Sequence, residues 1–536
     1  MKLQLKILGM MLLCTSAVFA QIKYDVHIKG GTIYNGSGTA SFVGDVLISN
    51  DRIAYVGPSI EAEAETLIDA TGKAIAPGFI NMLSWAYSSL DKDGRSLSDI
   101  KQGVTLEVFG EGRSAGPSGS KDEGDYVSFG QAMQKLENQG VSTNVASFLG
   151  AATVRVQTVG YDNRKATEEE FLEMDQIVEE AMKEGAMGIG SSLIYAPGDF
   201  ADTDELIRIS AAASKHGGMY ISHMRDEGRN VMQALEELIE IAEKADIPAE
   251  IYHLKTSRPA NWHLLDTVIE RVEQARAKGL QITADMYTYN ASSTGLTGVI
   301  PTWVQAGGHR AWMNRMREAE PRKRLIKDIE AELAMQPADG ILMVGFNKDS
   351  LADIYRGKTI AQSALMRGQS EAETIIDLML EDDSRIQCIY FSMSEENIQR
   401  KIQIPWMSFC SDAGSYTTFD DDFRTHPRAF GSFIRVLGKY SRDLGLLSLE
   451  EAVYKLSGFP ATNLKLKDRG FLYEGYYADL VVFDPEQVQD HATFDDPLQF
   501  ATGVEYVLVN GIMVLNEGEH TNKFPGRFVK GPGYQD

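Results

Sequence analysis

The middle of this 536-residue chain alternates short apolar runs with helical stretches rich in Ala, Glu and Lys. Between residues 76 and 464 the runs include SFLGAAT, GIGSS, MYISH, AEIYHLK and QITADMY, separated by segments such as NVMQALEELIEIAEKA. Alternation at this spacing predicts a parallel sheet whose strands are joined by helices. The number of units favours a closed (β/α)8 TIM-like barrel over an open doubly wound sheet. No Gly-x-Gly-x-x-Gly follows the first run, as a dinucleotide-binding fold would require.

The two ends of the chain have a different pattern, in which apolar and polar residues alternate. Residues 24–70 contain YDVHIKGGTIYNGSG and FVGDVLISNDRIAYVG, and the C-terminal part contains ADLVVFDP and VEYVLVNGIMVLNEG. Period-2 alternation broken by Asn-Gly and Asn-Asp turns predicts antiparallel strands. We therefore expect residues 21–75 and 465–536 to form one discontinuous β-sandwich domain, with a barrel of residues 76–464 between them.

Residues 301–370 interrupt the rhythm of the predicted barrel. The segment begins PTWVQAGGHRAWMNRMREAEPRKRLIKDIEAELAM, which is helical in pattern and rich in Arg and Met. A helical excursion from a barrel loop can cover an active site, or it can be packing decoration. The sequence leaves both roles open for this helical insert.

The charge of the chain restricts its partners. With 52 Lys and Arg against 76 Asp and Glu, the formal net charge is -24. Such a surface does not attract nucleic acid or anionic lipid, so we expect neither as a partner. A folded enzyme or a small-molecule binding protein is the default interpretation of this composition. The sequence carries no pattern that fixes the oligomeric state.

Residues 1–20, MKLQLKILGMMLLCTSAVFA, have the pattern of a secretory signal peptide. Lys2 and Lys6 precede an apolar run, and small residues close it at Val18 and Ala20. The run is shorter than the roughly 20 residues that a spanning helix needs. We therefore expect an exported protein, periplasmic or extracellular, with no membrane span.

Polar residues stand at the carboxyl ends of several predicted strands. MYISH ends on His223, AEIYH on His253, ITADMY on Tyr287 and WMSFCSD on Asp412. The reacting groups of barrel enzymes lie at this end of the strands. A single His there is more often a hydrogen-bonded structural residue, but two His and one Asp at equivalent positions suit a zinc-type metal. The sequence therefore predicts a metal site at the carboxyl end of the barrel.

Longer motifs around these residues resemble a known family. The runs GIGSSLIYAPGDFADTDEL, SHMRDEG, HLK, TADMYTYNASSTGL, SFCSDAGS and HPRAFGSFIRVLGKY are similar to those of the N-acyl-D-amino-acid deacylase (D-aminoacylase) family of the amidohydrolase superfamily. The N-terminal GGTIYNGSG, the IAPGFI before the barrel and the C-terminal ADLVVFDP extend the resemblance over nearly the whole chain after the signal peptide. The combination is specific to that family rather than to TIM barrels in general.

The resemblance implies roles for individual residues. It makes His223 and His253 metal ligands and Asp412 the general base that takes a proton from water and delivers it to the leaving amine. It makes Arg428 a bidentate partner of the substrate carboxylate, where the alternative from the residues alone is a surface ion pair. The further positions that it assigns to the substrate pocket are Tyr195, Tyr287 and Ser293.

The chain departs from the family pattern at the entrance of the barrel. Family members carry PGFID-x-H-x-H there, with two His that bind metal, and this chain reads PGFINMLSWAYSSL. Asn81 replaces the Asp, and Leu83 and Trp85 occupy the His positions. Leu and Trp cannot bind a metal, although Trp85 can wall an apolar acyl pocket. We therefore expect one divalent metal per chain, zinc, in place of two.

A second departure lies at the second predicted strand, where GVTLEVFGEGRS stands in place of a Cys metal ligand. Glu111 is the nearest replacement, because a carboxylate can bind zinc in place of a thiolate. Glu107 is the lesser candidate, and a solvated acid at the strand end is the third interpretation. Lys255 lies two residues after His253 and shares its face of the strand. We group it with the substrate-binding residues and leave its role open between an ion pair and site electrostatics.

The resemblance implies a metal-dependent hydrolase that cleaves the amide bond of N-acyl-D-amino acids or related N-acyl compounds, with a metal-activated water and Asp412 as general acid and base. Two alternatives stay open. One is a non-catalytic amidohydrolase-like binding protein that has lost its metal. The other is a hydrolase of cyclic amides or of dipeptides with a D-residue.

Overall fold

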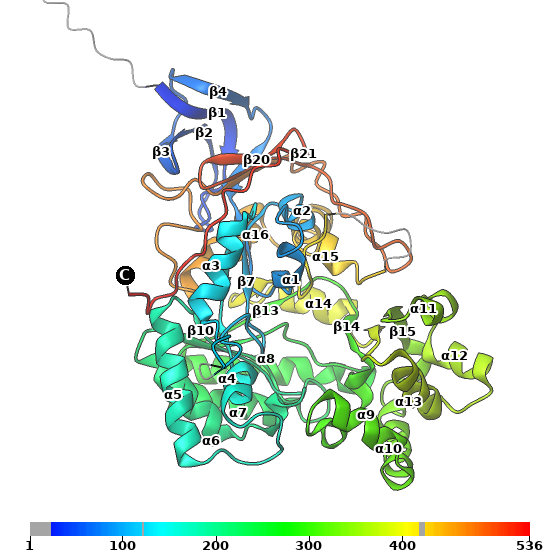
Figure 1. Ribbon diagram of the computed structural model, residues 1–536. Helices are drawn as coiled ribbons and strands as arrows, with labels where there is room; N and C mark the ends of the chain where they lie inside the picture. Colours follow the sequence, from blue (N-terminus) through cyan, green and yellow to red (C-terminus); the bar gives the residue numbers. More distant parts are fainter. Residues whose placement is uncertain (1–22, 121–122, 418–423, 536) are drawn as a thin grey trace, which may run out of the picture.

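The computed structural model describes residues 23–120, 123–417 and 424–535, and Figure 1 shows their arrangement. The predicted signal peptide, residues 1–20, lies outside the described residues. Within the described part of the chain, no helix is long and apolar enough to cross a membrane. The described residues form a central barrel, a small β domain built from both chain ends, and an insert on one side of the barrel.

The barrel is built from parallel strands that pair in two groups, β6–β7–β8 and β9–β10–β11–β12–β13–β17. The amide of Phe148 donates to the carbonyl of Phe109 (2.8 Å) and carries the β7 pairing from β8 into β9. The amide of Met82 donates to the carbonyl of Phe409 (3.3 Å) between β6 and β17 and closes the ring. The bounds are β6 Phe79–Asn81, β7 Val104–Phe109, β8 Asn144–Ser147, β9 Leu149–Gly150, β10 Gly188–Ser192, β11 Met219–His223, β12 Ala249–Ile251, β13 Ile282–Met286 and β17 Met407–Phe409. With β8 and β9 as parts of one strand, the described residues form the predicted (β/α)8 barrel, which confirms the fold class.

Helices cover the outside of the barrel. In α5 (Glu168–Lys183), the Thr167 side chain accepts from the amide of Glu170, whose side chain accepts from the amide of Thr167, so a capping box starts the helix. Met174 and Val178, four residues apart, are buried against the barrel. The other α-helices of the barrel are α1 Tyr87–Leu90, α2 Leu97–Ile100, α3 Phe129–Gln139, α4 Ala151–Thr158, α6 Thr203–Ser214, α7 Val231–Lys244, α8 Leu265–Ala277, α14 Glu395–Ile402, α15 Arg428–Gly431, α16 Leu449–Leu456 and α17 Gly458–Asn463. A π-helix spans Val436–Asp443.

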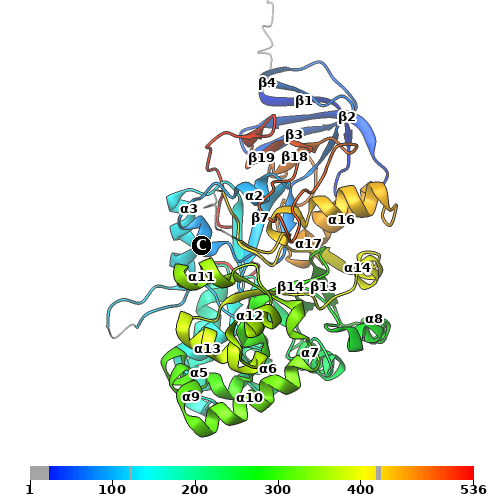
Figure 2. The same cartoon turned by 90° about the vertical axis from the view of Figure 1, so that its right-hand side faces the viewer.

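The small domain is a nine-stranded sheet to which both chain ends contribute, at the top of Figures 1 and 2. Its order is β21–β20–β19–β18–β5–β1–β2–β3, with β4 also paired to β1. The two ends meet where β18 runs antiparallel to β5, with Leu480 opposite Pro77. The last residues leave this domain and run along the barrel, where the amide of Val529 donates to the carbonyl of Val145 (2.8 Å). The bounds are β1 Lys23–Ile33, β2 Phe42–Ser49, β3 Arg52–Gly57, β4 Glu63–Asp69, β5 Ala74–Pro77, β18 Leu480–Phe483, β19 Val504–Val509, β20 Ile512–Asn516 and β21 Glu519–His520.

The insert has a sheet and a core of its own. Its antiparallel strands are β14 Ser292–Gly295, β15 Ile341–Gly345 and β16 Gln387–Tyr390. Its helices, grouped on one side of the barrel at the lower right of Figure 1, are α9 His309–Arg317, α10 Ala319–Leu333, α11 Asp349–Tyr355, α12 Ile360–Arg367 and α13 Glu371–Asp382. Trp312, Met316 and Ile329 are buried in its core. The insert thus runs from β14 to β16 and extends beyond the predicted residues 301–370. The sequence did not indicate β14 and β16, because these strands are short and lack a long apolar run.

Candidate active site

The side chains of the site project from the carboxyl ends of the barrel strands. Glu111 lies two residues after β7, His223 ends β11, and His253 lies two residues after β12. Tyr287 follows β13 directly and Asp412 lies three residues after β17. Parallel strands place their carboxyl ends at one mouth of the barrel, so residues far apart in the sequence meet there.

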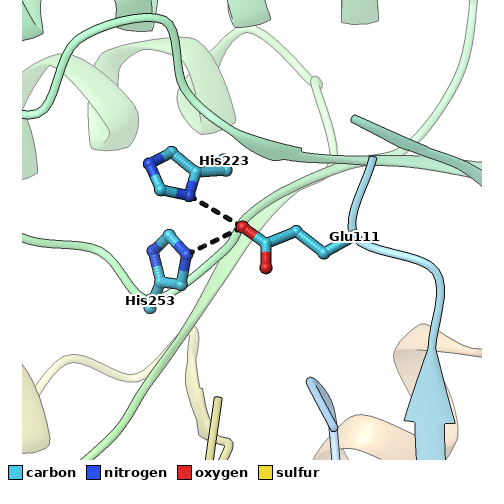
Figure 3. A group of neighbouring side chains, drawn as sticks. All are labelled: Glu111, His223 and His253. Atoms are coloured by element: carbon cyan, nitrogen blue, oxygen red, sulfur yellow. Dashed lines mark hydrogen bonds and ion pairs between the residues drawn. The ribbon is translucent and has the colours of Figure 1, made fainter. Parts of the chain in front are cut away.

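Glu111, His223 and His253 converge on one point, as Figure 3 shows. Oε1 of Glu111 lies 2.7 Å from Nδ1 of His223 and 3.3 Å from Nε2 of His253. The two imidazole centroids are 4.4 Å apart, with the rings nearly perpendicular. All three side chains are buried. The three residues predicted from the sequence as metal ligands are therefore brought together.

A second carboxylate, Glu227, lies on the opposite side of the two imidazoles. Its Oε1 is 3.1 Å from Nδ1 of His253 and its Oε2 is 3.5 Å from Nε2 of His223. Lys255 is 3% exposed, and its Nζ lies 2.7 Å from Oε1 of Glu227 and 2.7 Å from Nδ1 of His253. Glu227 was not among the residues predicted from the sequence, although its position four residues after His223 in SHMRDEG was a usable signal.

The electrostatics of this cluster are set by burial and by close opposite charges. Burial raises the pKa of the Glu111 carboxyl, but hydrogen bonds from His223 and His253 and the charge on those rings bring it below its ordinary value. Burial and Lys255 lower the pKa of His253, but Glu227, Asp412 and Glu111 outweigh them and raise it to about 9. Without a metal, the carboxylates thus favour a charged His253, a state that a bound divalent cation would replace.

Asp412 is held from two sides. Nε1 of Trp85 donates to Oδ1 (3.1 Å) and Nη1 of Arg428 donates to Oδ2 (2.6 Å). Burial lowers the pKa of Arg428, but the charges of Asp412 and neighbouring groups raise it above its ordinary value, so the guanidinium stays charged. The residue predicted to bind a substrate carboxylate is therefore paired with the predicted general base in this structure.

His253 and Asp412 both have left-handed backbones, with φ of 35° and 49°. This region is uncommon for residues other than glycine, and each such residue costs on the order of 1–3 kcal/mol. Each of the two residues ends one of the apolar runs from which the sequence predicted the site. We infer that the local turn directs each side chain into the barrel mouth at the expense of backbone strain.

The residues assigned to the substrate pocket surround this cluster. The Tyr287 hydroxyl is buried and without a hydrogen-bond partner among the described residues, and Arg428 lies 4.6 Å above its ring. The Tyr195 ring lies 5.5 Å from the His223 ring, and its hydroxyl donates to Oγ1 of Thr294 (2.7 Å). Ser293 lies on β14 of the insert, and its hydroxyl donates to the carbonyl of Cys388 (2.9 Å). Of Tyr195, Tyr287 and Ser293, Tyr287 is therefore the one whose hydroxyl has no partner among the described residues, and Nε of Arg428 likewise has none.

The other candidates predicted from the sequence make contacts outside the group of Glu111, His223 and His253. Oε2 of Glu107 accepts from Ser84 (2.7 Å) and its Oε1 accepts from Thr143 (2.9 Å), and the side chain is fully buried. Leu83 is buried among apolar side chains of the barrel interior. Asn81 donates to Oγ of Ser411 (2.8 Å) and so ties β6 to the loop after β17.

A cavity of about 1600 Å³ lies over the cluster. Glu111, His223, His253 and Asp412 all line it, as does the exposed ring of Trp85. The insert contributes to the same wall, through residues that include Thr294, Pro301, Arg324 and Arg385. The sequence left open whether the insert covers the active site or is packing decoration. Its side chains in the cavity wall support a role at the active site.

The cluster fits a divalent metal. One carboxylate oxygen and two imidazole nitrogens from Glu111, His223 and His253 lie within 4.8 Å of one another. These are ligand types that zinc accepts, and three protein ligands leave a further position for water or substrate. The buried, converging donors therefore form a site that can hold a metal ion.

The chain belongs to the amidohydrolase family, whose sequence profile matches residues 128–515. D-aminoacylase from Alcaligenes xylosoxydans xylosoxydans is 32% identical over 522 residues, which cover 94% of this chain and 97% of that protein. N-acyl-D-glutamate deacylase from the same organism is 31% identical over 95% of this chain and 97% of that protein. The resemblance found in the sequence is thereby confirmed.

Solved structures agree with this assignment. The crystal structure of D-aminoacylase is similar with a TM-score of 0.79 at 32% identity, over 95% of this chain and 100% of that one. The structure of N-acyl-D-glutamate deacylase from Bordetella bronchiseptica, complexed with zinc and a phosphonate inhibitor that mimics the tetrahedral intermediate, has a TM-score of 0.79 at 28% identity, over 95% and 100% of the two chains. Both similarities include the barrel and the β domain.

Proposed function

We propose that this chain is a zinc-dependent hydrolase that removes the acyl group from N-acyl-D-amino acids. The observation that carries the proposal is the convergence of Glu111, His223 and His253 in the cavity that Asp412 also lines. Water adds to the amide carbonyl, the C–N bond breaks, and a carboxylate and a free amino acid result. Relatives named D-aminoacylase and N-acyl-D-glutamate deacylase, similar over nearly the whole chain, support this substrate class.

We propose a single zinc per chain. Leu83 is buried in the barrel interior and Trp85 contacts Asp412, so the positions of the second metal's His pair hold no metal-binding side chain. A solved D-aminoacylase described in terms of one-metal activation and second-metal attenuation supports an active centre with one metal. Bound between Glu111, His223 and His253, the metal would polarise the substrate carbonyl and acidify water.

The residues around the cluster then have distinct tasks. Asp412 takes a proton from water and returns it to the departing nitrogen, so one carboxylate serves as base and then as acid. Arg428 and Trp85 fix the position of that carboxylate through its two oxygens. The buried hydroxyl of Tyr287 and the guanidinium of Arg428 stacked above its ring give the substrate carboxylate a donor and a positive charge.

The test is a hydrolysis assay of paired N-acyl-D- and N-acyl-L-amino acids together with zinc analysis of the purified protein. We expect turnover of the D-series, one zinc per chain, and loss of activity in Asp412→Asn with zinc retained. Turnover confined to cyclic amides or to dipeptides would contradict the substrate class. A zinc content near zero together with no turnover would favour a binding protein instead.

We further propose that the protein is exported to the periplasm or the medium. The charged start and apolar run of residues 1–20, with Ala20 at the end, support this. Expression of the full chain in a Gram-negative host should yield a mature protein that starts at Gln21 in the periplasmic or medium fraction. Recovery of the uncleaved chain from the cytoplasm would refute the proposal.

A further inference from the structure

Each of the two metal-ligating imidazoles lies between two carboxylates. Glu111 faces Nδ1 of His223 and Nε2 of His253, at 2.7 Å and 3.3 Å. Glu227 faces the remaining nitrogens, with 3.1 Å to Nδ1 of His253 and 3.5 Å to Nε2 of His223. Nε2 of His223 is buried and makes no hydrogen bond in the described structure. One nitrogen of each ring thus turns toward the metal position and the other toward Glu227.

We propose that Glu227 is a positioning residue of the metal site, a single carboxylate that orients both imidazoles. With a metal bound, its two oxygens are placed to accept the N–H hydrogens of His253 Nδ1, at 3.1 Å, and of His223 Nε2, which has to close in from 3.5 Å. The lone pairs of the opposite nitrogens would then be directed at the metal. A carboxylate behind a ligating histidine fixes its tautomer and raises its basicity. Here one carboxylate serves two ligands. The inference rests on the proposed function only in requiring that a metal binds at Glu111.

The two nitrogens of an imidazole point in divergent directions, and this argues against Glu227 as a metal ligand. A metal held by Glu111 and the facing nitrogens would therefore lie on the far side of both rings from Glu227. Glu227 is also tied to the neighbouring loop, because its carbonyl accepts from the amide of Ser257 (2.6 Å). That bond couples the loop after β11 to the loop that carries His253.

Lys255 supplies the compensating charge. A buried carboxylate is costly unless it is paired, and Nζ of Lys255 lies 2.7 Å from Oε1 of Glu227. Nζ also lies 2.7 Å from Nδ1 of His253, so the lysine and Glu227 share that nitrogen. When Nε2 of His253 binds a metal, Nδ1 carries the hydrogen and can only donate, so the carboxylate becomes its partner. Lys255 is thereby assigned the role of an ion-pair partner that holds Glu227. Of the two roles left open by the sequence, this is the ion pair.

The experiment measures zinc affinity without substrate. Wild type, Glu227→Gln and Glu227→Asp are titrated with zinc against a chromophoric chelator, and the melting temperature of each metal-free protein is recorded. Glu332→Gln is the matched control, because Glu332 is another carboxylate of the cavity wall, paired with Arg258 at 2.7 Å. We expect Glu227→Gln to weaken zinc binding by about 10- to 100-fold while one zinc still binds at saturation. Glu227→Asp should recover part of the loss, and Glu332→Gln should leave the affinity at the wild-type value.

Two results would overturn the inference. Wild-type zinc affinity in Glu227→Gln would show that the carboxylate does not orient the ligands. Failure of a folded Glu227→Gln protein to bind zinc at saturation would make Glu227 a ligand instead. The absorption spectrum of the cobalt(II) form separates these cases, because an orienting residue leaves the number of ligands unchanged. A wild-type chain that binds zinc but hydrolyses no N-acyl-D-amino acid would refute the proposed function and leave this inference standing.

Discussion

Trp85 donates its indole hydrogen to Oδ1 of Asp412 across 3.1 Å, and it stands where the family pattern PGFID-x-H-x-H has a histidine. The other oxygen of Asp412 accepts from Arg428. The residue on which the proposed single-metal site rests therefore also supplies a hydrogen-bond donor to the proposed general base. Trp85 thus bears on two proposals at once, the single metal and the position of the base.

We expect Trp85→Phe to lower kcat by about tenfold or more, because a hydrogen bond to a charged group contributes roughly 1.5–3 kcal/mol. The phenyl ring keeps most of the wall that Trp85 forms, so KM and zinc content should change little. The measurement is steady-state hydrolysis of an N-acyl-D-amino acid, with zinc analysis on the same sample.

A matched control exists in the insert. Nε1 of Trp303 donates to Oδ2 of Asp328 (3.0 Å), the same kind of bond away from Asp412. Trp303→Phe should leave kcat within a factor of about two, because the lost bond does not touch the general base. Equal losses of kcat in both variants would mean that Trp85 acts only through packing.

The fold was predictable because its signals are local and periodic. Runs such as MYISH, followed by amphipathic helices, marked the barrel, and the alternating ends marked the sheet in which β18 meets β5. The insert was predicted only in part. Its helices have a clear pattern, but β14 has the sequence SSTG, whose place in a sheet depends on pairing with the distant β16. A strand that is set by tertiary partners has little signature of its own.

The candidate site, like the fold, was predictable from the sequence only in part. His223, His253 and Asp412 end strand runs, so their positions along the sequence predicted that they would meet at one mouth of the barrel. Glu227 follows its strand by four residues and depends on the conformation of the loop to reach both imidazoles. The contact between Trp85 and Asp412 joins residues 327 positions apart, which no periodicity reveals.

Glu111 should be the carboxylate that the metal requires. Glu111→Ala removes one of the three proposed ligands and should weaken zinc binding by about 100-fold or more. Glu111→Cys should retain a bound zinc, since a thiolate is also a zinc ligand. Glu107→Gln should bind zinc as wild type does, because Glu107 accepts from Ser84 and Thr143 away from the cluster. Competition with a chelator measures the zinc affinity of wild type and of the three variants. Weaker zinc binding in Glu107→Gln than in Glu111→Ala would refute the assignment of Glu111 as the ligand.

Arg428 should matter both to Asp412 and to the substrate carboxylate. A hydrogen bond to a charged group contributes roughly 1.5–3 kcal/mol, so Arg428→Ala should lower kcat/KM by about 10- to 100-fold. The second role is tested with N-acetyl-D-methionine and its carboxamide, which lacks the negative charge. Wild type should prefer the acid, and Arg428→Ala should lose that preference. A preference unchanged by the substitution would leave Arg428 only its pairing with Asp412.

Glu250 makes the stability of the barrel sensitive to pH. Its side chain is fully buried on β12, and Oε2 accepts from Oγ1 of Thr283 (2.5 Å) while Oε1 has no partner among the described residues. Burial, and then the charge of Asp285, raises the pKa of Glu250 to about 8 from an ordinary 4.5. At a pH between these two pKa values, Glu250 is therefore protonated in the folded state and ionised in the unfolded state.

Between pH 4.5 and about 8, folding takes up a proton at Glu250. The resulting contribution to the free energy of unfolding is fully present below pH 4.5 and is lost as the pH rises through about 8. Glu250→Gln is neutral at every pH and keeps the shape of the side chain. Between pH 6 and pH 8 we expect the wild type to lose on the order of 2 kcal/mol of unfolding free energy more than Glu250→Gln, at about 1.4 kcal/mol for each pH unit. Urea denaturation of both metal-free proteins at the two pH values measures the difference. Parallel losses in the two proteins would show that Glu250 is ionised in the folded barrel.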